Sequence, residues 1–115
     1  ALVFDAQGRL VAITGSPGGA RIIGYVAQSL VALLDWGMEP ALAAALPHVG
    51  PLNNAVELEE GTAVARLAAM LQERGLPVVT MAMPSGLNLI RIHPGTPPVV
   101  SGAADPRREG LVAAD

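Results

Sequence analysis

The sequence predicts a single small α+β domain in which helices cover an antiparallel or mixed sheet. Three observations support this prediction. The 115 residues suffice for one domain with a buried core. Strand-like and helix-like segments alternate in the order ββααβαβββ, with no repeat and no internal domain boundary in the sequence. The longest helical segment is apolar nearly all round, which is typical of a helix buried on several sides in a layered fold.

A hairpin and a long helix are expected first. Residues 2–4 and 9–14 are strand-like on either side of the turn Asp5-Ala6-Gln7-Gly8, whose Asp and Gly favour a tight reversal. The glycine-rich run 15–19 ends the second strand, and a helix is predicted from 20 to about 36. Its apolar residues recur at three- and four-residue spacing and continue onto a second face: Ile22, Val26, Leu30, Leu33 and Leu34, then Ile23, Ala27 and Val31.

The remaining elements are shorter. Gly37 ends the long helix, and Pro40 opens a second helix through Ala45, because proline suits a first helical turn. Residues 46–54, rich in Pro, Gly and Asn, are predicted to be loop, and 55–58 a strand. An amphipathic helix over 62–73 ends at Gly75, with Val64, Leu67, Ala68 and Leu71 on its apolar face. Strands follow over 78–82 and 87–92, separated by Pro84-Ser85-Gly86. A proline-rich loop over 93–101 and an edge strand over 111–114 complete the prediction.

Composition excludes several classes of protein. The net charge is −3, there is no lysine, and the three aromatic residues cannot form a base-stacking platform, so nucleic-acid binding is not expected. Cysteine is absent, which excludes disulfides and thiolate metal sites. The longest apolar stretch, 22–34, is shorter than the roughly 20 residues of a membrane span. Charged residues make up only 15%, so some apolar surface is expected to face a missing partner.

The most informative stretch for chemistry is 14–21, Thr-Gly-Ser-Pro-Gly-Gly-Ala-Arg. Here a strand ends, a glycine-rich loop follows and a long helix begins. Backbone N–H groups and the positive end of the helix dipole suit an anion or a developing oxyanion. The spacing is not that of a Walker loop, a G-x-S-x-G elbow or a dinucleotide fingerprint. Local chemistry leaves open the alternative that the turn simply requires glycines.

The same residues resemble the γ-glutamyltransferases, also called γ-glutamyl transpeptidases. Residues 15–23, Gly-Ser-Pro-Gly-Gly-Ala-Arg-Ile-Ile, are similar to that family's Gly-Ser-Pro-Gly-Gly-(Ser/Ala)-Arg-Ile segment. Residues 102–110, Gly-Ala-Ala-Asp-Pro-Arg-Arg-Glu-Gly, are similar to its closing Gly-Ala-Ser-Asp-Pro-Arg-Arg-Asp-Gly. Weaker matches at 35–38, 45–48 and 71–75 lie in the same order, so the resemblance covers essentially the whole chain.

The resemblance implies a fold and an activity. The fold is the αββα sandwich of the N-terminal-nucleophile hydrolases, of which this chain is expected to form part. A threonine freed by self-cleavage attacks the γ-glutamyl amide of glutathione-like substrates, and the acyl-enzyme passes to water or an acceptor amine. The family's adjacent loop glycines supply the oxyanion hole, so Gly18 and Gly19 are the expected catalytic residues here. No cofactor and no metal are implied.

The departures from the family pattern concern the chain's start. Ala1 stands in strand-like residues without a polar lead-in, which indicates a chain cut inside an element. The family's threonine, paired serines and substrate-gripping carboxylate and arginine would all lie upstream. The chain therefore resembles the C-terminal part of the small subunit, is expected to be inactive alone, and would need the large subunit and the rest of the small one. Substrate-binding residues are not identified, and localisation stays open: periplasmic or secreted with an export signal on the parent, otherwise cytoplasmic.

Other candidate residues favour structural roles. His48 and His93 are expected to pack in loops rather than bind metal. Glu57, Glu59 and Glu60 include a carboxylate pair of the kind glycosidases use, but a solvated strand end is the preferred interpretation. Residues 105–108, Asp-Pro-Arg-Arg, predict a side-chain-capped turn with a local ion pair. Ser16 and Thr14 lack a nearby base, and four methionines are read as core filler: Met38, Met70, Met81 and Met83.

Two functional alternatives come from other classes. The chain could be a non-catalytic α/β interaction module that kept the fold and lost the chemistry, or a small anion-binding domain that uses the glycine loop. A sandwich without its first strands would leave sheet edges and apolar faces open, so self-association of the isolated chain is also expected.

Overall fold

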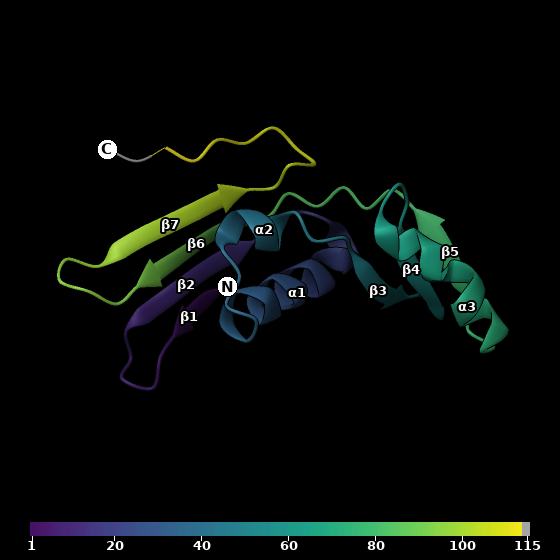
Figure 1. Ribbon diagram of the computed structural model, residues 1–115, viewed down its shortest axis with the longest axis horizontal. Coiled ribbons are helices and arrows are strands. Elements are labelled where there is room, and N and C mark those ends of the chain that lie inside the picture. Colours follow the sequence, from purple (N-terminus) through teal and green to yellow (C-terminus); the bar gives the residue numbers. More distant parts are fainter. Residues whose placement is uncertain (114–115) are drawn as a thin grey trace. The chain divides into compact units, whose positions relative to one another are not determined.

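The computed structural model describes residues 1–113 of the chain (Figure 1). These fold as two compact units: the first combines Ala1–Leu46 with the chain from Ser85 onward, and the second is Pro47–Pro84. No helix among the described residues is long and apolar enough to cross a membrane. That the whole chain acts as one domain stays a prediction.

An antiparallel sheet of four strands forms the first unit. Its strands are β1 (Leu2–Phe4), β2 (Leu10–Gly15), β6 (Asn88–His93) and β7 (Val99–Ala104), in the order β1-β2-β6-β7. The predicted β1–β2 hairpin is confirmed. Its turn is capped by Asp5, whose Oδ1 accepts the N–H groups of Gln7 and Arg9, both at 2.9 Å.

Helices α1 (Ile22–Leu34) and α2 (Pro40–Ala44) cover one face of this sheet (Figure 1). Both helices were predicted, and a 3₁₀ turn, η1 (Gly19–Arg21), precedes α1. The sheet-facing residues of α1 are buried: Tyr25, Ser29, Ala32 and Leu33. The prediction that α1 is buried on several sides is wrong for this chain, because Ile23 is 79% exposed and Val31 and Leu34 are exposed as well.

The opposite face of the same sheet carries aliphatic side chains and no helix. Residues paired directly across antiparallel strands share a face, which places Leu2, Ile13 and Ile90 in one row. Ile92 and Val100 form the next row. We call this surface of five residues the open sheet face. Leu2 is 62% exposed and Val100 61% exposed, so much of the face meets solvent in this chain.

The second unit contains a three-stranded mixed sheet. Strands β3 (Val49–Leu52) and β4 (Ala55–Glu59) are antiparallel, and β5 (Val78–Met81) pairs parallel to β4. The prediction of a loop over 46–54 is wrong, because this segment contains β3. As an edge strand, β3 tolerates Pro51. Asn53 and Asn54 both have positive φ (50° and 64°), the conformation of a type I′ hairpin turn.

The predicted helix over 62–73 is present but begins as a 3₁₀ helix. It comprises η2 (Ala63–Leu67) and α3 (Ala68–Glu73), and ends as expected at Gly75, whose φ is +81°. Two predictions in this unit are wrong. Met70 is 42% exposed and is not core filler, and Glu57 and Glu59 are buried rather than solvated, because β4 is the central strand of its sheet.

The final strand lies earlier in the chain than predicted. Residues 99–104 form β7 and extend the sheet beside β6, so only 94–98 of the predicted proline-rich loop are irregular. The predicted edge strand over 111–114 is wrong for 111–113, which are irregular, and Ala114 lies outside the described residues. Val112 lies against Gly102 of β7, where a Cβ on the glycine would approach Val112 Cγ1 to 3.3 Å.

Candidate functional site

The glycine-rich loop between β2 and α1 has a backbone that only glycine adopts readily. Gly18 has φ 146° and ψ 11° and is the N-cap of η1, and Gly19 has φ 58°. A Cβ on Gly18 would lie 2.7 Å from Tyr25 Cε2, whereas a Cβ on Gly19 would meet nothing within 4 Å. The alternative that the turn requires glycines therefore holds for the backbone. It is compatible with a chemical role for the same loop.

The loop presents backbone donors without partners. Within residues 1–113, neither the N–H of Gly18 nor that of Gly19 donates a hydrogen bond, and no side chain caps η1. The Gly18 carbonyl is already used, because it accepts the Arg21 N–H at 3.1 Å. Gly18 is partly exposed and Gly19 is exposed. Two adjacent N–H groups at the start of a helical segment suit an anion or an oxyanion.

Ser16 holds the loop to the start of β6. The Ser16 hydroxyl donates to the Pro17 carbonyl at 2.8 Å and accepts the Gly86 N–H at 3.0 Å. The Thr14 hydroxyl is buried and pairs with the Ser29 hydroxyl at 3.0 Å. These contacts give both hydroxyls structural roles, which agrees with the prediction that neither is a nucleophile.

Residues 105–108 form the capped turn with an ion pair that the sequence predicted. Asp105 Oδ1 accepts the Arg107 N–H at 2.9 Å and pairs with Arg107 Nη1 at 3.2 Å, and the Asp105 carbonyl accepts the Arg108 N–H at 3.3 Å. Arg107 also donates to the carbonyls of Ala44 (2.9 Å) and Leu46 (2.8 Å). The turn is thereby fastened to the end of α2.

The Asp105 carboxylate is ionised although it is only 3% exposed. Burial opposes ionisation, but hydrogen bonds from the Ser85 hydroxyl, from the N–H groups of Arg107 and Leu87 and from the Arg107 guanidinium outweigh it. Together they hold the pKa of Asp105 below its usual value of 3.8.

Asp105→Asn is expected to destabilise the protein at neutral pH and to lose this effect in acid. Because the folded pKa lies below the unfolded value of 3.8, the stabilisation is fully present above that value and disappears as the pH falls through the folded pKa. Urea unfolding of the wild type and of Asp105→Asn, in steps from pH 7 downward, measures the gap between their free energies of unfolding. The gap should narrow only below about pH 4; a gap constant down to pH 2 would contradict an ionised, stabilising Asp105.

A small hollow adjoins the glycine loop. Its volume is about 150 Å³, and it is lined by Pro17 of the loop, by residues 86–88 where β6 begins, and by 104, 105 and 108–110. Its lining brings together the loop, the start of β6 and the Asp105 turn, which are far apart in the sequence.

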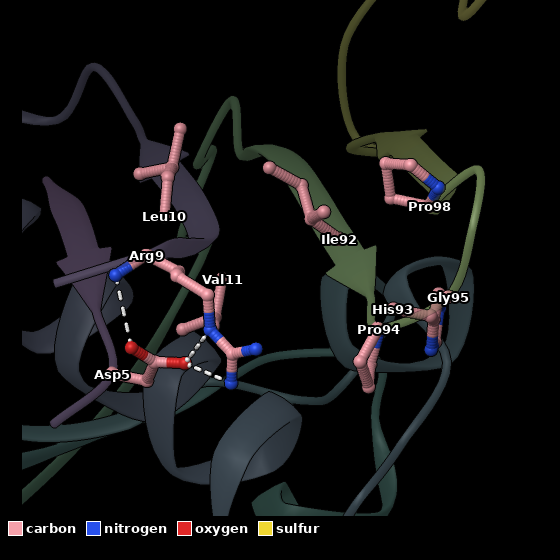
Figure 2. Close-up of a pocket in the computed structure, with 9 residues that line it drawn as sticks. All are labelled: Asp5, Arg9, Leu10, Val11, Ile92, His93, Pro94, Gly95 and Pro98. Atoms are coloured by element: carbon pink, nitrogen blue, oxygen red, sulfur yellow. Dashed lines mark hydrogen bonds and ion pairs between the residues drawn. The ribbon is translucent and has the colours of Figure 1, made fainter. Parts of the chain in front are cut away.

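A larger pocket lies at the other end of the sheet, between the β1–β2 and β6–β7 turns (Figure 2). Its volume is about 380 Å³. Its lining is mostly apolar, and its two charged side chains pair with each other: Arg9 Nε and Nη2 both contact Asp5 Oδ2 at 2.7 Å. The hydrogen bonds from Arg9 lower the pKa of Asp5. The two charges in the pocket lining therefore neutralise each other.

The two histidines lie in different units. His48 is buried, and its N–H donates to Glu59 Oε2 at 2.8 Å. The His93 ring contacts the Ser101 hydroxyl at 2.9 Å between neighbouring strands. Over the described part of the chain, no group of three potential ligands is placed to hold a metal ion.

Sequence reasoning missed the support beneath the glycine loop. Ser85 and Gly86 were read only as a break between strands, yet Ser85 bonds Asp105 and Gly86 bonds Ser16. The signal was indirect: a Pro-Ser-Gly break and an Asp-Pro turn flank the two strands that the structure pairs. Nothing local in the sequence connects either of them with residue 16.

Sequence comparison finds similar proteins over most of the chain. A sequence model of the γ-glutamyltranspeptidase family matches residues 1–115. The glutathione hydrolase proenzyme of Escherichia coli K12 is 32% identical over 103 residues, which are 88% of this chain and 17% of that protein.

Solved structures agree in fold. A crystal structure of an acivicin-inhibited γ-glutamyltranspeptidase superposes with a TM-score of 0.83 at 27% identity, covering 96% of this chain and 60% of that one. A mutant of Helicobacter pylori γ-glutamyltranspeptidase also gives a TM-score of 0.83 at 27% identity, covering 94% and 59%. The chain thus spans less than two thirds of each relative.

The α+β fold of the N-terminal-nucleophile type, expected from the sequence, is confirmed by these structures. The first unit supplies one sheet with one layer of helices. Because the family model matches its whole length, the chain belongs to the γ-glutamyltranspeptidase family.

Proposed function

We propose that this chain is the C-terminal part of a γ-glutamyltransferase-like enzyme that transfers or hydrolyses γ-glutamyl groups of glutathione-like substrates. A threonine upstream of the chain is the nucleophile. Its hydroxyl oxygen attacks the γ-carbonyl carbon, the amine leaves with a proton, and the acyl-enzyme is released by water or by an acceptor amine. The contribution of this chain is the oxyanion hole.

The observation that carries the proposal is the pair of N–H groups on Gly18 and Gly19 at the start of η1, which have no partner among the described residues. An oxyanion forms only in the tetrahedral intermediate, so donors held ready for it lower the barrier without tightening substrate binding. The positive φ values of both glycines fix the direction of these donors. The loop is held in place by the hydrogen bonds of the Ser16 hydroxyl with the Pro17 carbonyl and the Gly86 N–H, and by the close approach of Pro17 to Gly86.

The chain alone is proposed to be inert. An oxyanion hole without a nucleophile lacks the group that forms the acyl-enzyme. Release of a chromogenic amine from a γ-glutamyl anilide tests this on the 115-residue chain and on a version extended through its natural N-terminus. We expect release by the extended protein only. Amine release by the short chain would contradict the proposal that the nucleophile lies upstream. If a folded extended protein released no amine, a non-catalytic interaction module would be favoured.

The open sheet face is proposed to pack against the rest of the parent protein, namely the large subunit and the N-terminal part of the small subunit. Its five aliphatic residues form one contiguous surface, and burying such a surface is favourable. In the isolated chain the same surface, with the edge strand β7 beside it, favours self-association.

The isolated chain is therefore expected to form dimers or larger assemblies. Light scattering over a wide concentration range measures this, with Ile90→Lys as the matched variant. Ile90 is 38% exposed at the centre of the open sheet face, so a charge there should shift the chain toward monomer. A compact wild-type monomer at every concentration would contradict the prediction.

A further inference from the structure

The buried turn at Asp105 contacts the segment on which the glycine loop rests. Asp105 Oδ2 accepts hydrogen bonds from the Ser85 hydroxyl and from the Leu87 N–H (3.0 Å). The Asp105 N–H in turn donates to the Leu87 carbonyl at 2.8 Å. The carboxylate thus holds the residues on both sides of Gly86.

Gly86 transmits this position to the loop. Its N–H donates to Ser16 Oγ at 3.0 Å, and a Cβ in its place would lie 2.8 Å from Pro17 Cγ. Ser16 and Pro17 therefore rest directly on the Gly86 backbone, without a side chain between them. The next two residues along the loop are Gly18 and Gly19.

The opposite side of Asp105 is anchored to the helical layer. Arg107, which binds Asp105 Oδ1, also donates to the carbonyls at the end of α2. Arg108 Nε donates to the Ser85 carbonyl at 3.1 Å, a second tie to the same segment. Hydrogen bonds thus connect α2 to the Asp105 turn and the turn to Ser85 and Leu87. The backbone through Gly86 continues this connection to Ser16 of the loop.

We propose that Asp105 is a positioning residue for the oxyanion hole, acting through Ser85–Gly86 on Ser16–Pro17 and so fixing the direction of the Gly18 and Gly19 N–H groups. This inference rests on the proposed function. Asp105 does not reach the reacting atoms; it sets where the donors lie. A displacement of about 1 Å at such donors is enough to cost roughly 100-fold in rate.

The test uses the complete enzyme with Asp105→Asn, Ser16→Ala and the double variant. Asp105→Asn is expected to lower kcat for a γ-glutamyl anilide by about 10- to 100-fold, with KM within about twofold. Affinity for a γ-boronic analogue, which forms a tetrahedral adduct, should fall by the same factor as kcat/KM. Ser16→Ala should lower kcat in the same way, and the double variant should lose little more than Asp105→Asn, because both act along one line of contacts.

Arg91→Gln is the matched control for stability. Arg91 Nη1 donates to the Leu33 carbonyl at 2.5 Å, a partly buried hydrogen bond in the same unit that does not lead to the loop. Arg91→Gln should lower the unfolding midpoint as Asp105→Asn does, and should leave kcat and the affinity for the boronic analogue unchanged. If Asp105→Asn lowers only the midpoint, Asp105 is merely structural and the proposal fails. If Asp105→Asn does not fold, Ser16→Ala decides by the same readouts.

Failure of the proposed function would be visible separately. If the wild-type complete enzyme releases no amine, the acyl-transfer assignment is wrong, and crystal structures of wild type and Asp105→Asn then decide the positioning. Displacement of residues 16–19 in the variant would support it. An unchanged loop would overturn it.

Discussion

Gly18→Pro in the complete enzyme is expected to lower kcat/KM for a γ-glutamyl anilide by at least about 100- to 1,000-fold, the cost of losing one oxyanion donor. Proline has no N–H, so one of the two donors disappears. Its ring also fixes φ near −65°, whereas Gly18 has φ 146°, so the loop must rearrange as well. The measurement is steady-state kinetics together with the affinity for a boronic tetrahedral analogue.

Gly19→Ala separates donor loss from backbone strain. Gly19 has φ 58°, and a Cβ there meets nothing within 4 Å, so alanine keeps the N–H at the modest cost of a left-handed conformation. Gly8→Ala is the matched control: φ is 77°, the space is equally free, and the residue lies in the β1–β2 turn away from the loop. Gly19→Ala should resemble Gly8→Ala in stability and retain far more activity than Gly18→Pro. Near-normal turnover by Gly18→Pro would contradict the assignment of the oxyanion hole to this loop.

Features encoded locally could be read from the sequence. The strand–glycine–helix pattern at 14–21 and the Asp-Pro-Arg-Arg turn at 105–108 each depend on neighbours a few residues away. The support of the loop could not be read in this way. Its decisive bonds join Gly86 to Ser16 and Ser85 to Asp105, which are 70 and 20 residues apart. Only the pairing of β6 with both β2 and β7 brings these segments together.

The missed strands and the misread carboxylates have a common cause. Pro51 and the two asparagines indicate a loop unless the segment is known to lie at a sheet edge and to end in a hairpin turn. Glu57 and Glu59 indicate solvent unless β4 is known to be the central strand. In each case the tertiary position of the strand overrode local propensity.

Leu33→Ala should be among the most destabilising single substitutions in the first unit, with an expected loss of about 2–5 kcal/mol in the free energy of unfolding. Leu33 is fully buried on α1, where its neighbours on the same face include Ala32 and Ser29. These small residues cannot expand into a cavity. A loss of this size is a large fraction of the total stability of a small domain.

Ile23→Ala is the matched control, because it deletes the same number of carbon atoms from the same helix. Ile23 is 79% exposed, so its truncation in the isolated chain should change stability by less than about 0.5 kcal/mol. Urea unfolding of both variants measures the difference, and equal losses would contradict the assignment of the buried face of α1. In the complete enzyme, comparing Ile23→Ala with Leu33→Ala also tests whether the outer face of α1 is covered. If the parent protein covers the outer face of α1, Ile23→Ala becomes costly there, and the apolar pattern around that helix is explained by a layer that this chain does not contain.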